Sequence, residues 1–158
     1  MILKVKRLTP TAQLPKKAYS TDACYDIYAD NHYDIYYSTV NNKYCEGTIV
    51  PAHSYVVFNT GISIEIPTGY FCTVFSRSGM GFKDNLRLSN CVGIIDADYR
   101  GEWKVKIYND GNVDKVIARG ARIAQFAVLP VLDSEIEEVN EISNTERGEN
   151  GFGSSGTN

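Results

Sequence analysis

Residues 102–109, EWKVKIYN, alternate apolar and polar side chains with a period of two. Trp103, Val105 and Ile107 fall on one side of an extended chain, while Lys104, Lys106 and Tyr108 fall on the other. A helix would need apolar residues three and four positions apart, so this stretch predicts a β-strand with one buried face and one wet face.

The same period recurs in LKVKRL at residues 3–8 and in GISIEIP at residues 61–67, where Ser63 and Glu65 are expected on the wet side. Turn-forming residues interrupt the runs at positions 67–69, 109–111 and 119–120. Strands this short and this often divided predict an all-β antiparallel sandwich or barrel. The sequence allows one short helix, directly after Ser78.

The bulk composition fits one globular domain. The chain has 158 residues, of which 43% are hydrophobic and 22% charged, and its net charge of -3 gives no general attraction to nucleic acid. No stretch approaches the length of a membrane span, and the first ten residues lack a signal-peptide pattern. The four cysteines have no metal-clip spacing and are expected as free thiols in a reducing compartment. We therefore expect a cytoplasmic protein with no membrane or nucleic-acid partner.

Two segments differ from the rest of the chain. Residues 30–48 are polar and tyrosine-rich, which predicts a surface hairpin or extended loop. Residues 143–158 hold a glycine- and serine-rich run that cannot build a core. The expected organisation is a β-barrel domain over residues 1–142, with 30–48 as a surface insertion, and a mobile C-terminal arm over residues 143–158.

The corner GIIDADYRGE, residues 93–102, is the first candidate for chemistry. An aspartate at a protected corner near a phosphate chain could accept a proton from water, although two aspartates in a turn are more often caps or turn bonds. Arg77 and Ser78, before the one expected helix, could hold an anion or form a simple cap. Gln125, within an apolar strand, is a structural bridge or a ligand contact.

The tail is the second candidate. Arg147 could bind a phosphate with its forked guanidinium, Phe152 could stack on a base, and the glycines allow close approach of backbone N–H groups to phosphate. A flexible end with no role is the alternative. Asp26, in YDIYA, is either a further acid of the site or a surface charge.

Taken in order along the chain, these features resemble the five motifs of the homotrimeric dUTP pyrophosphatases (dUTPases). The motif positions are Asp26, then Arg77, Ser78 and Gly79, then Asn90 with residues 93–101, then Gln125, then Arg147 with residues 151–156. The resemblance implies an all-β, distorted jelly-roll barrel, and a homotrimer whose active sites are shared between copies. It implies hydrolysis of dUTP to dUMP and pyrophosphate, which keeps uracil out of DNA and supplies dUMP for dTMP synthesis.

The resemblance also implies roles for single residues. Asp96 would activate the water that attacks the α-phosphate, and Tyr99 would pack against the deoxyribose and leave no room for a 2′-hydroxyl. The uracil would be read by a hairpin and its supporting residues, which are Asn90, Gly93, Ile94, Ile95 and Lys104.

The phosphates would be met by Arg77, Ser78, Gly79 and Gln125, and the arm would close over them with Arg147, Gly153, Ser154 and Ser155. Phe152 would stack on uracil. Asp26 would support Mg²⁺ through a water and keep the site in order. The family commonly has Gly at the position of Cys24 and Pro at that of Ser76, and residues 30–48 are longer than its usual connection.

Two other functions remain open. The first is deamination of dCTP on the same fold, which would need an additional base near the exocyclic amine of cytosine. The second is a nucleotide-gated binding or regulatory protein, which only the 30–48 segment favours.

Overall fold

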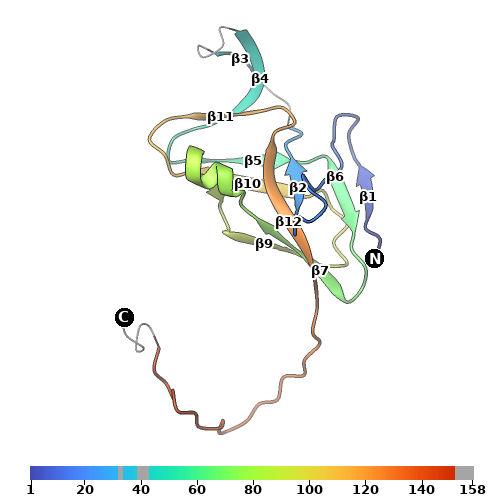
Figure 1. Ribbon diagram of the computed structural model, residues 1–158, viewed down its shortest axis with the longest axis vertical. Coiled ribbons are helices and arrows are strands. Elements are labelled where there is room, and N and C mark those ends of the chain that lie inside the picture. The colour runs from blue at the N-terminus through green and yellow to red at the C-terminus, as the bar shows by residue number, and fades with distance from the viewer. Residues whose placement is uncertain (32–33, 39–42, 152–158) are drawn as a thin grey trace.

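The computed structural model describes residues 1–31, 34–38 and 43–151, and almost every element in it is a β-strand (Figure 1). The predicted all-β, jelly-roll-like fold is confirmed, and the expected helix is a single π-helical turn, η1 (Met80–Asp84). The strands are β1 (Lys4–Arg7), β2 (Tyr25–Tyr28), β3 (Asp34–Ser38), β4 (Lys43–Val50), β5 (Tyr55–Asn59), β6 (Ile62–Glu65), β7 (Tyr70–Phe75), β8 (Leu86–Leu88), β9 (Val92–Ile95), β10 (Lys104–Asn109), β11 (Lys115–Ala118) and β12 (Arg122–Pro130).

Antiparallel sheets build the body of the molecule. A four-stranded sheet has the order β2-β12-β7-β9, and a three-stranded sheet has the order β5-β10-β8. β1 pairs with β6, and β11 pairs with β4, which in turn pairs with β3. β9 is an edge strand, because β7 is its one partner among the described residues.

The core lies between the sheets and confirms the alternation in β10. Trp103, Val105 and Ile107 are at most 3% exposed, and the Trp103 ring meets Phe126 of β12 edge-on, with ring centroids 5.0 Å apart. Loss of an aromatic ring from such a core typically costs about 3–5 kcal/mol. This aromatic contact therefore ties β12 to the chain at the start of β10.

Ser63 departs from its predicted place on a wet face. It is 8% exposed, because the loop that precedes β10 covers this side of β6. The Ser63 hydroxyl donates a hydrogen bond of 2.7 Å to the carbonyl oxygen of Arg100 in that loop. Glu65, two residues further along the strand, is exposed as expected.

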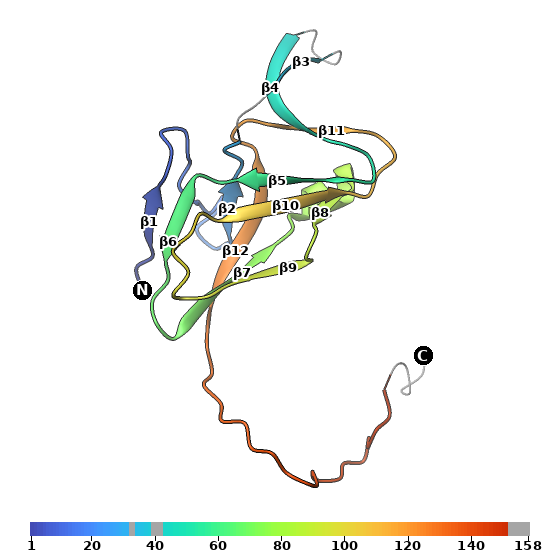
Figure 2. The same cartoon turned by 180° about the vertical axis from the view of Figure 1, so that it is seen from behind.

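The predicted hairpin within residues 30–48 is present as β3 and β4, which pair antiparallel from Asp34 opposite Gly47 to Ser38 opposite Lys43. It projects from the body of the molecule, as the views from both sides show (Figures 1 and 2). The other side of β4 pairs with β11, so the hairpin is anchored to the barrel through a continuous sheet.

The chain leaves the body after β12. The backbone N–H of Val131 still bonds to the carbonyl oxygen of Gly69, at 2.9 Å, and residues 131–150 are exposed and run away from the barrel (Figure 1). The arm boundary at residue 143 stays a prediction. Among the described residues no helix is long and apolar enough to cross a membrane.

Candidate functional site

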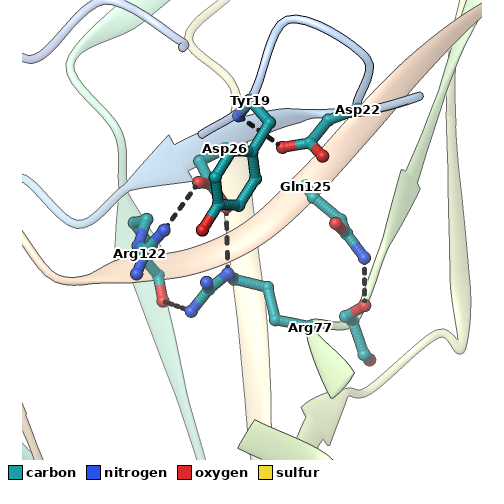
Figure 3. A network of polar contacts seen from close by, with 7 residues as sticks. Tyr19, Asp22, Asp26, Arg77, Arg122 and Gln125 are labelled. Atoms are coloured by element: carbon teal, nitrogen blue, oxygen red, sulfur yellow. Dashed lines mark hydrogen bonds and ion pairs between the residues drawn. The ribbon is translucent and has the colours of Figure 1, made fainter. Parts of the chain in front are cut away.

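Asp26 lies at the centre of a charged network on the four-stranded sheet (Figure 3). Its Oδ1 accepts a hydrogen bond of 2.9 Å from Nε of Arg77, and its Oδ2 accepts one of 3.1 Å from a terminal nitrogen of Arg122. The Asp26 side chain is 11% exposed, so the surface-charge interpretation is wrong. Arg77 also reaches the carbonyl oxygen of Arg122, at 3.4 Å, which holds the guanidinium across the end of β12.

Gln125 and Ser76 form a second polar contact beside this network. The Gln125 side-chain amide donates to the carbonyl oxygen of Ser76 at 3.1 Å, and the Ser76 hydroxyl accepts from the backbone N–H of Leu88 at 2.9 Å. Gln125 is therefore at least a structural bridge. Ser76, where the family commonly has Pro, uses its hydroxyl to join the end of β7 to β8.

The turn that follows Arg77 is open on one side. Gly79 occupies the cap position of η1, and no side chain caps this turn, so the simple Ser78 cap is not what the structure contains. Ser78 and Gly79 are exposed. A hollow of about 310 Å³ lies here, lined by Ser76, Arg77, Ser78, Gly81 and Phe82.

The β9–β10 pocket is a hollow of about 280 Å³ between the edge strand β9 and the β5-β10-β8 sheet. All five residues predicted to bind uracil line this pocket: Asn90, Gly93, Ile94, Ile95 and Lys104. The other lining residues are Val74, Leu88, Ser89, Val105 and Lys106. A Cβ at Gly93 would lie 3.3 Å from the Cβ of Val74 and 3.5 Å from the side-chain nitrogen of Asn90. A larger residue here would therefore crowd Val74 and Asn90, two other residues of the pocket wall.

A second hollow, the Asp96 pocket, also measures about 280 Å³ and is lined by Ile94, Ile95, Asp96, Tyr99, Glu102, Trp103 and Lys104. It shares Ile94, Ile95 and Lys104 with the β9–β10 pocket, so the two hollows adjoin. Together they form one elongated depression along β9.

The aspartates of this corner are not turn caps. The turn is closed by the backbone N–H of Tyr99, which bonds to the carbonyl oxygen of Asp96 at 3.2 Å. Within the described part of the chain, neither the Asp96 nor the Asp98 carboxylate accepts a hydrogen bond. The exposed Asp96 carboxylate therefore lines this pocket without forming a hydrogen bond that stabilises the fold.

The polar network is centred on one edge of the four-stranded sheet and the depression follows the other, because β2 and β9 are its two edge strands. Asp26, Gln125 and Phe75 are direct cross-strand neighbours and project to one face. Val74 and Gly93, which line the β9–β10 pocket, are likewise cross-strand neighbours and belong to the other face. One small molecule in the depression thus meets the groups of the corner but not those around Asp26 in the same chain.

The tail residues are only partly described. Arg147 is exposed and its Nε bonds to the nearby carbonyl oxygen of Asn150, at 2.8 Å. Its side chain lines none of the hollows described above. The predicted contacts of Phe152, Gly153, Ser154 and Ser155 fall outside the described residues.

Two of the cysteines, Cys24 and Cys72, are poor candidates for nucleophilic catalysis. Among the described side chains, Cys24, Cys72 and Cys91 are free thiols. Burial raises the pKa of Cys72 to about 11, so this thiol beneath the depression is protonated near neutral pH. Desolvation also raises the pKa of Cys24.

Sequence reasoning missed two residues of the site. Arg122, the second partner of Asp26, lies in the same apolar strand as Gln125. A charged residue in that strand could have indicated a further polar contact near Gln125. Glu102 lies within the quoted corner but was given no role, although its side chain accepts a hydrogen bond from the backbone N–H of Gly61 at 2.8 Å.

Known proteins resemble this chain over its whole length. Residues 11–156 match the dUTPase family. A deoxyuridine 5'-triphosphate nucleotidohydrolase of Anaplasma marginale is 40% identical, with 98% of each chain covered. One of Candida albicans is 38% identical, with 99% of this chain and 89% of the relative covered. The solved structure of Staphylococcus bacteriophage 80alpha dUTPase with dUPNHPP superposes with a TM-score of 0.78 at 29% identity, over 99% of each chain. For those phage dUTPases, control of virulence-gene transfer by a proto-oncogenic G protein-like mechanism is described.

Proposed function

Because the chain belongs to the dUTPase family, we propose that it hydrolyses dUTP to dUMP and pyrophosphate. The observation that carries this proposal is the elongated depression along β9, where two adjoining hollows are lined by the residues of the third motif. Two adjoining hollows of about 280 Å³ each suit a base and the sugar attached to it. The proposed role is to keep uracil out of DNA and to supply dUMP.

The uracil occupies the β9–β10 pocket in this proposal. As an edge strand, β9 has backbone N–H and C=O groups that no other described strand uses, and these can pair with the edge of a base. Asn90 supports the base from the side, and Gly93 admits its flat ring. The close walls disfavour the methyl group of thymine.

The chemistry takes place at the Asp96 pocket. Asp96 accepts a proton from a water whose oxygen attacks the α-phosphorus, and the bond to the bridging oxygen breaks with its electron pair on pyrophosphate. Tyr99 packs on the deoxyribose in the same pocket. The free Asp96 carboxylate supports this role, because no structural bond must be broken before it binds water.

The phosphates are met by a second copy of the chain. Asp26 lies on β2, at the sheet edge away from β9, and Asp26 and Gln125 project to the face opposite Val74 and Gly93 of the pocket. With Arg77, they therefore serve a nucleotide held by a neighbouring copy in this proposal. Arg77, with Ser78 and Gly79 beside it, neutralises charge that moves towards the leaving pyrophosphate. This separation supports the homotrimer with shared sites that the resemblance implies.

Mg²⁺ is the cofactor that the resemblance implies, and the surroundings of Asp26 fit it as an outer ligand. Within the described residues, no group of three or more His, Cys, Asp or Glu could hold a metal ion directly. Each Asp26 oxygen accepts one guanidinium bond and keeps capacity for a water. Mg²⁺ typically binds through phosphates and waters, so Asp26 would hold it through a water. The ion would supply neutralisation of phosphate charge.

The C-terminal arm closes over the bound nucleotide in this proposal. Its exposed course away from the barrel leaves it free to reach a site in another copy (Figure 2). Arg147 would then exchange its bond to the Asn150 carbonyl for a phosphate, and Phe152 would cover the uracil. A closing lid excludes water other than the nucleophile.

A regulatory function is the second candidate. The β3–β4 hairpin projects from the barrel, and phage relatives of the same fold are described with a G protein-like mechanism. Such a function would accompany hydrolysis, because the residues proposed for catalysis are present.

Pyrophosphate release from dUTP, dTTP, dCTP and UTP, measured side by side with Mg²⁺, tests the proposal. We expect release from dUTP alone. Preference for dTTP or UTP would overturn the pocket assignment, and ammonia from dCTP would indicate the deaminase instead.

A further inference from the structure

The loop that carries Asp96 and Tyr99 is fastened to the corner between β5 and β6. The Thr60 hydroxyl donates to the carbonyl oxygen of Trp103 at 2.6 Å, and the backbone N–H of Trp103 donates to the carbonyl oxygen of Ile62 at 3.0 Å. The Ser63 hydroxyl holds the Arg100 carbonyl at 2.7 Å. These bonds are buried or partly buried, so the loop has little freedom to shift against β6.

Glu102 connects this corner to Tyr99. Its side-chain Oε1 accepts the backbone N–H of Gly61 at 2.8 Å, and its own carbonyl oxygen accepts the Tyr99 hydroxyl at 3.0 Å. The hydroxyl bond fixes the far end of a ring that is otherwise 46% exposed. The ring position therefore depends on where residue 102 is held.

Gly101 lies against the hydroxyl end of the Tyr99 ring. A Cβ at this position would sit 2.5 Å from Cζ of Tyr99 and 2.9 Å from its Cε2, and would also overlap the hydroxyl oxygen. Gly101 has no left-handed backbone conformation, so what makes glycine necessary here is the ring and not backbone strain.

We infer that Gly101 and Glu102 are specificity-determining positioning residues, which hold the Tyr99 ring against the sugar and thereby exclude ribonucleotides. The inference rests on the proposed function, because it assumes that the Asp96 pocket takes the sugar of dUTP. A ring lifted off Gly101 or released from Glu102 leaves space for a 2′-hydroxyl. Neither residue needs to touch the substrate for this effect.

The first test compares Gly101→Ala in two backgrounds, using kcat/KM for dUTP and for UTP. In the otherwise unchanged chain, we expect the dUTP-to-UTP ratio to fall about tenfold or more, the usual scale for a lost steric contact in a pocket. In a Tyr99→Ala background the same substitution should change the ratio less than about twofold, because no ring remains to displace. Equal loss for both substrates, or an equal fall in both backgrounds, would overturn the inference.

The second test uses Glu102 and does not depend on the glycine. Glu102→Gln keeps a side-chain oxygen for the Gly61 N–H and should retain the dUTP-to-UTP ratio, while Glu102→Ala should lower it. Fluorescence of Trp103, the chain's one tryptophan, checks that each variant is folded, because that side chain is 1% exposed in the same corner. An unchanged ratio in Glu102→Ala would contradict the inference.

Different results would overturn the proposed function and the role of Gly101 and Glu102. A wild-type chain that hydrolyses dUTP and UTP equally, or neither, would overturn the proposed function and the inference together. A selective wild type whose Gly101→Ala and Glu102→Ala variants stay equally selective would overturn the inference alone.

Discussion

Replacement of Asp26 by Asn is the most informative test of the charged network. The amide keeps one oxygen for Arg77 but turns an N–H₂ group towards the Arg122 nitrogen that now lies 3.1 Å from Oδ2. One hydrogen bond between charged groups is lost and the other weakens. Such bonds contribute about 1.5–3 kcal/mol each, and because the Arg122 side chain is 46% exposed we expect a total cost of about 2 kcal/mol.

Asp110→Asn provides a matched control. Asp110 binds Arg87 through both oxygens, at 2.7 and 3.2 Å, but the two side chains are 46% and 41% exposed. An exposed pair of this kind contributes less than about 1 kcal/mol, and salt screens most of it. The two variants thus differ mainly in burial of the aspartate.

Urea unfolding followed by Trp103 fluorescence measures both costs, at low salt and at high salt. We expect Asp26→Asn to lose about 2 kcal/mol at both salt concentrations, and Asp110→Asn to lose little at low salt and less at high salt. Asp26→Asn should also lower kcat/KM for dUTP, since the bond that positions Arg77 loses its charge and weakens, while Asp110→Asn should not. Equal costs in the two variants would refute the structural role of the network.

Three further predictions follow from individual residues. Asp96→Asn should bind dUTP yet release pyrophosphate far more slowly; normal turnover would remove Asp96 as the base. Deletion of residues 144–158 should leave a folded protein with almost no turnover, as circular dichroism and pyrophosphate release can check; full activity would exclude the lid. Burial raises the pKa of the Cys72 thiol from 9.0 to about 11. As the pH rises, this thiol therefore loses its proton in the unfolded chain before it does so in the folded protein. The free energy of unfolding should fall between pH 9 and 11 as a result. Cys72→Ala should reduce the slope of unfolding free energy against pH by up to about 1.4 kcal/mol per pH unit. If the variant and the wild type showed the same pH dependence, the burial of Cys72 would be contradicted.

The sequence predicted those parts of the fold that local periodicity encodes. Alternation in residues 102–109 identified the buried face of β10, because a strand with one wet face must alternate. Ser63 was wrongly predicted to be exposed, because the loop containing Arg100 covers it. The alternation within a strand does not reveal whether a distant loop covers its polar face.

The candidate site was predictable where motif residues lie close together in the sequence. Asn90, Gly93 and Asp96 were expected to line one site, and they line the depression along β9. The pairing of Asp26 with Arg122 was not predictable, since it depends on the register of β2 against β12, which a bulge shifts between Arg122 and Ala124.

The central claim is that one active site combines Asp96 from one copy with Arg77 from another, and mixing inactive chains tests it directly. Asp96→Asn and Arg77→Gln chains, each inactive alone, would be co-refolded in equal amounts and assayed for pyrophosphate release from dUTP. Random assembly gives about one-quarter of the sites both intact groups, so we predict recovery of about a quarter of wild-type activity. A mixture no more active than its separate components would contradict the shared site.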